Sequence, residues 1–255
     1  MRTVRPKSFH DQIVEEIGLQ IVGGELAAGA QIPPEPVLAE KLGVGRLAVR
    51  EAMKTLAAKG MVGIRPKTGT QVLPRASWNL FDPNVLQWHA AVSLDAKFVA
   101  DLMELRRLIE PAAARIAAGR ATNEQLAAMR QAYAAMESAV EHEDYIAADL
   151  RFHGAVLDAC DNQFLHHLQG AISEVLKISF TASSTPRRDA NRALALHRNL
   201  IDALEARDPQ AAEAAVGHLI DRASERIRLQ HPALAAPRSG EKSAAPPPRR
   251  RGVPG

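Results

Sequence analysis

Four residues in the later part of this 255-residue chain have the types and spacing of metal ligands. Asp149 and His153 stand four residues apart, so a helix would place the carboxylate and the imidazole on one face. His197 and His218 follow on two later stretches with strong apolar helical faces. Three imidazoles and a carboxylate from three helices would suit Zn²⁺, Ni²⁺ or Mn²⁺, with water or a ligand oxygen completing the shell. The alternative is structural, because an Asp–His pair at this spacing is most often only a hydrogen bond.

A second set of residues, within 35–72, has the pattern of a DNA-binding surface. This stretch predicts two short helices joined by a turn at Gly43–Gly45, followed by a two-stranded ribbon. Arg46, Arg50 and Lys54 recur at every fourth position of the second helix and share one exposed face. The tip of the ribbon contributes Arg65, Lys67, Thr68 and Gly69. Such a helix fits the major groove of DNA, and the tip would reach the adjacent backbone or minor groove.

Helical periodicity dominates residues 95–229 and predicts six helices without a strand. Their approximate ranges are 95–119, 122–142, 144–160, 162–181, 189–206 and 208–229. The short connections place these helices antiparallel in a bundle. Two apolar stripes are expected in its core, one of Leu105, Leu108, Ile109, Ala112 and Ile116 and one of Leu126, Met129, Tyr133, Met136 and Val140. The expected fold class is mainly α, with a winged helix-turn-helix domain followed by an all-α antiparallel bundle.

The chain divides into four expected segments. Residues 8–74 form the DNA-binding domain, which opens with a helix over 8–23 whose apolar face holds Phe9, Ile13, Ile17 and Ile21. Residues 75–94 are a linker with a short helix from Pro83, and Trp78 and Trp88 are expected to dock it on the helical body. Residues 95–229 are the helical domain with the candidate metal ligands. Residues 230–255, rich in Pro, Ala, Arg and Gly, predict a disordered tail.

Composition and charge narrow the class of protein. No apolar run reaches the roughly 18–20 residues of a membrane span, and the N-terminus lacks a signal-peptide core. Cys160 is the one cysteine, which excludes an intramolecular disulfide and suits a reducing compartment. Residues 1–75 carry a formal charge of +4, residues 76–229 carry −5 and residues 230–255 carry +4. A basic N-terminal domain followed by an acidic domain favours a protein whose first domain binds the phosphates of a nucleic acid. We expect such a protein to be cytoplasmic and to have no membrane partner.

Residues 9–73 resemble the winged helix-turn-helix of the GntR family of bacterial transcription regulators. The family pattern G-x-L-x-x-G-x-x-L-P-S-E stands here as residues 24–35, and L-A-x-x-L-G-V-S-R-x-x-V-R-E-A-L stands as residues 38–53. The Gly-Thr of the wing is at residues 69–70. Three places depart from the pattern. Pro34 replaces a capping serine, Pro36 stands where many members have an arginine that touches DNA, and Leu47-Ala48 replaces a polar residue and a proline, which implies a different operator sequence.

Residues 95–229 resemble the all-helical FCD effector domain of the FadR branch of this family. In its metal-binding members the ligands are an Asp and a His four residues apart and two later histidines. Asp149, His153, His197 and His218 match them one for one. The resemblance also implies that Arg106, within the E-L-R-x-x-x-E-P motif at residues 104–111, faces an effector carboxylate. The alternative for Arg106 is an ion pair within its own helix, with Glu110 or Glu104.

Within this branch the chain is most similar to regulators of the galactonate-operon repressor type, through residues 78–88 and 140–157. That similarity implies a sugar-acid effector, such as an aldonate. The favoured interpretation is a homodimeric repressor, not an enzyme, that leaves its operator DNA when a small organic acid binds near a metal ion. Two alternatives stay open: a metal-dependent enzyme in which the cluster activates water, and a regulator for which the metal itself is the signal.

Overall fold

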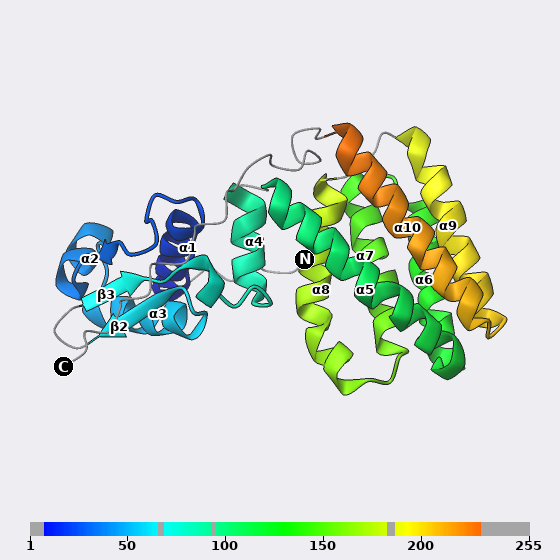
Figure 1. Ribbon diagram of the computed structural model, residues 1–255, viewed down its shortest axis with the longest axis horizontal. Helices are drawn as coiled ribbons and strands as arrows, with labels where there is room; N and C mark the ends of the chain where they lie inside the picture. Colours follow the sequence, from blue (N-terminus) through cyan, green and yellow to red (C-terminus); the bar gives the residue numbers. More distant parts are fainter. Residues whose placement is uncertain (1–7, 66–68, 93–94, 183–186, 231–255) are drawn as a thin grey trace, which may run out of the picture.

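The computed structural model describes residues 8–65, 69–92, 95–182 and 187–230. Figure 1 shows a small winged-helix unit and a larger helical bundle, with one short helix, α4, between them. The described residues form ten α-helices, a 3-10 turn and one three-stranded sheet, so the predicted mainly α fold class is confirmed. The wing residues Lys67 and Thr68 and the tail from residue 231 lie outside the described residues.

The winged-helix unit begins with helices whose ends follow local sequence signals. Its elements are α1 (Phe9–Val22), β1 (Gln31–Ile32), α2 (Glu35–Leu42), α3 (Arg46–Ala58), β2 (Val62–Arg65) and β3 (Gly69–Val72). Ser8 caps α1 by accepting the backbone N–H of Asp11, as its position predicts. Pro34 stands at the N-cap of α2, and no side chain caps this helix, because a proline replaces the serine of the family pattern. Gly43 ends α2 with a φ of 64°, a left-handed conformation that turns the chain toward α3.

The wing contains a third strand that the sequence did not predict. The strand order is β1-β3-β2, and both pairs are antiparallel. In the extra pair, Gln31 lies opposite Gln71 and Ile32 lies opposite Thr70. The expected two-stranded ribbon was therefore incomplete. A strand of two residues is too short for an alternating pattern, so only its pairing with β3 reveals it.

The buried faces of α1 and α3 largely follow the predicted periodicity. Helix α3 buries its predicted face, which consists of Val49, Ala52, Met53 and Leu56. Helix α1 buries Ile13, Ile17 and Ile21 against α3, but Phe9 is 65% exposed. Phe9 is the first residue of α1, beyond the reach of the helices that cover the rest of that face.

Helix α4 (Pro83–Val92), preceded by the 3-10 turn η1 (Arg75–Ser77), packs on both units. Trp88 belongs to the winged-helix core and lies over Gly18 of α1, where an added Cβ would be only 2.5 Å from its ring. Leu86 belongs to the bundle core. The expectation that the tryptophans dock this segment on the helical body is corrected for both, because Trp88 and the partly buried Trp78 pack on the winged-helix core. Gly18 leaves the space for the ring of Trp88, and no feature local to residues 75–94 reveals that space.

A buried ion pair ties α4 to the end of α3. Lys59 follows α3, is 8% exposed, and donates to both carboxylate oxygens of Asp82, at 2.8 and 2.7 Å. It also donates to the side chain of Asn84 at 2.9 Å. Asp82 in turn caps α4 by accepting the backbone N–H of Asn84. Charge-assisted hydrogen bonds in a buried setting hold geometry firmly, so we expect α4 to move with α3.

The bundle contains the six helices predicted for it, and their caps follow the sequence. They are α5 (Ala96–Arg120), α6 (Asn123–Ser138), α7 (His142–Asp158), α8 (Gln163–Ala182), α9 (Arg187–Glu205) and α10 (Pro209–Gln230). Thr122 and Gln125 form a capping box at the start of α6. Asp208 accepts the N–H of Ala211 at the start of α10, ahead of its first-turn proline. None of the described helices has the length and apolarity needed to cross a membrane.

Helix α5 buries a different face from the predicted one. Leu108 is 68% exposed and Ala112 is exposed, while Leu105, Ile109 and Ile116 are only partly buried. The buried positions are instead Phe98, Val99, Leu102, Met103, Arg106, Glu110, Ala113, Ala114, Ala117 and Ala118. This prediction was wrong because the true core face contains two charged residues and small alanines. The second predicted stripe is buried along α6, except for Val140, which lies beyond the end of the helix and is 73% exposed.

His89 of α4 is buried where α4 meets the start of α5. It is 3% exposed, its ring stacks on Phe98 with centroids 4.7 Å apart, and its Nε2 has no hydrogen-bond partner. Burial lowers the pKa of His89 to about 4, helped by the charge of Arg75 and opposed by that of Asp95. An imidazole in the unfolded chain has a pKa of roughly 6.5. Between these values the unfolded chain binds more protons, so stability falls as the pH falls.

We expect His89→Phe to flatten the acid side of the stability profile. Lowering the pH from 7 to 5 costs the wild type roughly 2 kcal/mol of unfolding free energy through this one group, and the variant lacks that loss. Urea unfolding at both pH values measures the difference. His167→Phe, at an exposed position, is the control. An equal pH dependence in wild type and His89→Phe would contradict the burial of a neutral imidazole at this junction.

Candidate functional site

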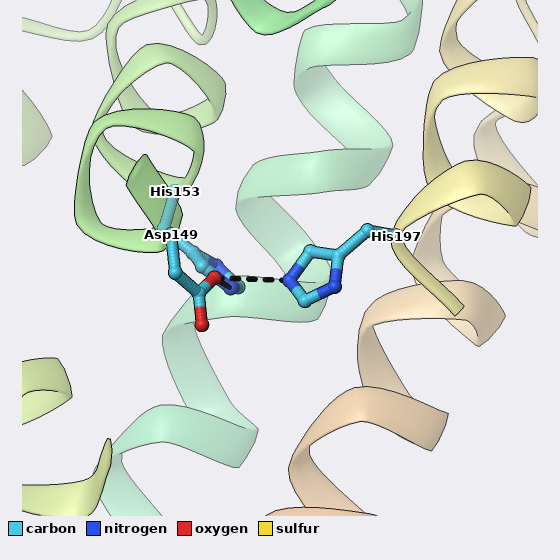
Figure 2. A group of neighbouring side chains, drawn as sticks. All are labelled: Asp149, His153 and His197. Atoms are coloured by element: carbon cyan, nitrogen blue, oxygen red, sulfur yellow. Dashed lines mark hydrogen bonds and ion pairs between the residues drawn. The ribbon is translucent and has the colours of Figure 1, made fainter. Parts of the chain in front are cut away.

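Three of the four predicted metal ligands meet in the core of the bundle (Figure 2). Asp149 and His153 project from α7, and His197 points toward them from α9. Each of the three is at most 4% exposed. The carboxylate Oδ1 of Asp149 lies 3.0 Å from Nε2 of His197 and 3.3 Å from Nε2 of His153. The candidate ligand atoms all lie within 4.8 Å of one another.

The fourth predicted ligand, His218, does not join this cluster. It is exposed on α10, whose buried positions are Ala212, Ala215, Val216, Leu219, Ile220, Ser224 and Ile227. Successive residues of an α-helix point about 100° apart, so Leu219 faces the core and the neighbouring His218 does not. The predicted quartet is therefore corrected to a trio. The apolar neighbours of His218 identified a core-facing helix, but not which of its residues face the core.

The ring nitrogens of both histidines face oxygen acceptors. Nδ1 of His197 is 2.8 Å from the carbonyl oxygen of Ala193, and its Nε2 faces Asp149. Nδ1 of His153 is 3.4 Å from Oε2 of Glu110, and its Nε2 also faces Asp149. A neutral imidazole has a single N–H, so it cannot donate in both directions. Protonation of the ring would supply the second N–H, and a cation bound by the two Nε2 lone pairs and the carboxylate would remove the need for it, because each Nδ1–H then keeps its own acceptor.

The spacing and charge of the trio also suit a divalent ion. Two atoms that share an ion at roughly 2.1 Å lie roughly 3.0 to 3.4 Å apart, and the two Asp149 distances of 3.0 and 3.3 Å fall in that range. Burial alone would raise the pKa of Asp149, but the charge of His197 and hydrogen bonds from His153 and His197 outweigh it and hold the pKa below its ordinary value. The carboxylate is therefore charged at neutral pH. Two imidazoles and one carboxylate leave coordination positions for other oxygen ligands.

The ring of Phe152 holds the two imidazoles in place. Phe152 is fully buried on α7, and both histidine rings meet it edge-on, with centroids 5.8 Å away for His153 and 5.2 Å away for His197. Edge-to-face contacts of this kind restrict ring rotation. The imidazole directions are thus set by packing as well as by polar contacts.

Arg106 lies inside the bundle on α5, with an ion pair as its main contact. It is 2% exposed, and its Nε donates to Oε1 of Glu110 at 2.6 Å. Its Nη1 donates to Oγ of Ser179 at 2.7 Å. The alternative of an intrahelical ion pair with Glu110 is therefore what the structure contains, and the effector role of Arg106 stays a prediction. Sequence reasoning named Glu110 only as a possible partner of Arg106, and it missed that Glu110 also lies beside His153 and that Ser179 contacts Arg106.

The predicted DNA-binding cations lie on the exposed face of α3. Arg50 donates to the carboxylate of Glu35 in α2 through Nε and Nη2, at 2.9 to 3.1 Å, and Lys54 pairs with Glu51 at 2.9 Å. Arg46 is exposed and makes no ion pair that the described residues show. In the wing, Arg65 is exposed at the end of β2 and Gly69 has a φ of 83°.

An apolar residue accompanies these cations at the start of α3. Leu47 lies in the first turn of the helix and is 70% exposed. The N-terminal residues of a recognition helix contact base edges in the major groove. An exposed leucine there suits an apolar contact with the methyl group of thymine.

Two protein-family models match the chain. The model described as bacterial regulatory proteins, gntR family, matches residues 9–72, which hold α1 to β3. The model described as FCD domain matches residues 101–222, from α5 into α10.

Two proteins of similar sequence have names that describe transcriptional repressors. The galactonate operon transcriptional repressor of Escherichia coli (strain K12) is 34% identical over 220 residues, which cover 86% of this chain and 96% of that protein. The probable D-xylose utilization operon transcriptional repressor of Paenarthrobacter nicotinovorans is 32% identical over 212 residues, 81% of this chain and 83% of that protein. Among solved structures, Lar, which controls the agr system of Listeria monocytogenes, superposes with a TM-score of 0.65 at 18% identity, covering 89% of this chain and 99% of that chain. The last match shows a shared fold.

We expect His197→Ala to abolish most metal binding and His218→Ala to leave it intact. Removing one of three protein ligands lowers affinity by on the order of 100-fold or more, whereas the exposed His218 contributes none. Isothermal titration of the metal-free protein with Zn²⁺ and Mn²⁺ measures both variants against the wild type. Equal losses of metal affinity in the two variants would contradict a metal site formed by the trio and would support the predicted quartet that includes His218.

Proposed function

This chain belongs to the gntR family of bacterial regulatory proteins and carries an FCD domain, and from that premise we propose that it is a repressor released from operator DNA by a small organic acid. Members of the family are DNA-binding transcription regulators, so the alternative of a metal-dependent enzyme is set aside. The observation that carries the proposal is the buried trio of Asp149, His153 and His197 in one chain with an exposed cationic helix, α3.

The proposed cofactor is Zn²⁺, Ni²⁺ or Mn²⁺, and the proposed effector is a sugar acid of the aldonate class. An ion with only three protein ligands can accept a carboxylate and a neighbouring hydroxyl oxygen from such a molecule. A guanidinium such as that of Arg106 suits bidentate contact with a carboxylate. The names of two relatives point the same way, since one refers to galactonate and the other to D-xylose utilization.

The proposed active form is a cytoplasmic homodimer whose two winged helices read two half-sites of a pseudo-palindrome. Effector binding at the trio favours one arrangement of α5, α7 and α9 around it. Because α4 contacts the bundle and is tied to α3 through Lys59 and Asp82, that arrangement changes how the two α3 helices are presented to DNA. The effector binds more tightly to the arrangement that does not fit DNA than to the one that does. The size of this difference in effector affinity limits how far operator affinity falls.

Fluorescence anisotropy with DNA from upstream of the protein's own gene tests this function. We expect the metal-loaded protein to prefer this fragment to a random duplex at physiological salt, and D-galactonate to lower that affinity. His197→Ala should bind the fragment as the wild type does but lose the response to galactonate.

Two outcomes would overturn parts of this account. Absence of any preference for the fragment would remove the DNA-binding function. If chelation of the metal alone released the protein from DNA, and galactonate or related aldonates had no effect on the metal-loaded protein, the ion would be the signal and the organic-acid effector would be ruled out.

A positive charge on α3 should contribute more to operator affinity than an equal charge on the bundle. We expect Arg46→Ala to lower affinity for the operator by roughly 10- to 100-fold and to reduce its salt dependence, because one cation fewer meets the DNA. Arg151→Ala, which removes an exposed arginine of α7, is the matched control and should change neither quantity. Equal effects of the two substitutions would mean that α3 is not the recognition helix.

A further inference from the structure

The buried polar groups of the bundle form one connected series. Nine polar or charged residues are buried in the described part of the chain, and six of them belong to this series. The series begins at Ser179 on α8, continues through Arg106 and Glu110 on α5 and then through His153 and Asp149 on α7, and ends at His197 on α9. Neighbouring members are 2.6 to 3.4 Å apart. Glu110 is the member that joins the arginine on one side to the histidines on the other.

We propose that Glu110 is a positioning residue for the metal ligand His153, an inference that rests on the proposed function. Its Oε2 lies 3.4 Å from Nδ1 of His153, on the side of the ring away from Asp149. A carboxylate there requires the proton to sit on Nδ1, which leaves the Nε2 lone pair directed at the ion. His197 has the same arrangement with a backbone carbonyl, that of Ala193, in place of the carboxylate.

The surroundings strengthen this contact. Glu110 is 4% exposed, and apart from Glu110 and His153 the small cavity beside them has apolar walls. Low polarity raises the strength of a hydrogen bond to a charged acceptor. Arg106 holds the carboxylate through Nε at 2.6 Å and Nη2 at 3.3 Å, so Glu110 cannot turn away from His153 without breaking that pair.

A different role for Glu110 is simple neutralisation of the buried charge of Arg106. The two roles make opposite predictions for a protein that lacks both charges. If Glu110 only neutralises Arg106, removing the arginine as well should restore metal affinity. If Glu110 positions His153, the affinity should stay low without it, whatever stands at residue 106.

The experiment compares metal affinities of the full-length chain. Metal-free wild type, Glu110→Gln, and the double variant Arg106→Met/Glu110→Gln are titrated with Mn²⁺ and with Zn²⁺ in competition with a chromophoric chelator. Glu104→Gln removes an exposed carboxylate from the same helix and is the matched control. Urea unfolding of each metal-free protein checks that the proteins compared are folded. Glu110→Gln alone leaves the buried charge of Arg106 without its partner, whereas the double variant carries no charge at either position. If Glu110→Gln unfolds, the metal affinity of the folded double variant still tests the proposal.

We expect Glu110→Gln and the double variant to bind both ions roughly 10- to 100-fold more weakly than the wild type, as loss of an outer partner of a metal-bound histidine does. Glu104→Gln should match the wild type. Wild-type affinity in either folded Glu110 variant would overturn the positioning role and leave the proposed function intact. A wild type that binds neither ion would overturn this inference together with the metal half of the proposed function.

Discussion

The core of the bundle places more oxygen acceptors around two buried histidines than neutral imidazoles can satisfy. His153 and His197 each direct both ring nitrogens at oxygen acceptors, and a neutral imidazole can satisfy only one. A divalent cation beside Asp149 removes the conflict by using the free lone pairs. Burial makes an unmatched nitrogen costly, because water does not reach these groups to complete their hydrogen bonds, so a bound cation or a protonated ring would be stabilised here. The packing of Phe152 against both rings keeps them in the arrangement that a cation requires.

Helix α5 connects this cluster to the DNA-binding unit. Its buried residues at every fourth position are Phe98, Leu102, Arg106 and Glu110. At one end Phe98 stacks on His89 of α4, and at the other Glu110 lies beside His153. Since α4 is also held to the end of α3 by a buried ion pair, one packed face of α5 leads from the cluster toward the recognition helix. In a regulator whose DNA affinity depends on a small ligand, packed side chains and rigid helices of this kind carry coupling between the two sites.

Local signals in the sequence predicted the order and ends of most elements, because caps and turns depend on neighbours along the chain. Ser8, the Thr122–Gln125 box and the glycine at residue 43 are examples. Pairing between distant segments was less accessible: β1 is two residues long, and the core face of α5 includes Arg106 and Glu110, so counting apolar residues selected the face with Leu108. In the site, spacing placed Asp149 and His153 on one helix face, and the resemblance to the FCD domain favoured them as metal ligands over a simple hydrogen-bonded pair. The exclusion of His218 needed the register of α10 against its neighbours, which its own sequence does not contain.

If a divalent ion binds at the trio, its coordination shell contains the two buried imidazoles and no third one. X-ray absorption at the zinc edge, on protein loaded with one equivalent of Zn²⁺, counts the imidazole nitrogens around the ion. The account predicts two imidazoles, from His153 and His197, with the carboxylate of Asp149 and further oxygen atoms completing the shell. A shell with three imidazoles, or one without any histidine, would contradict it.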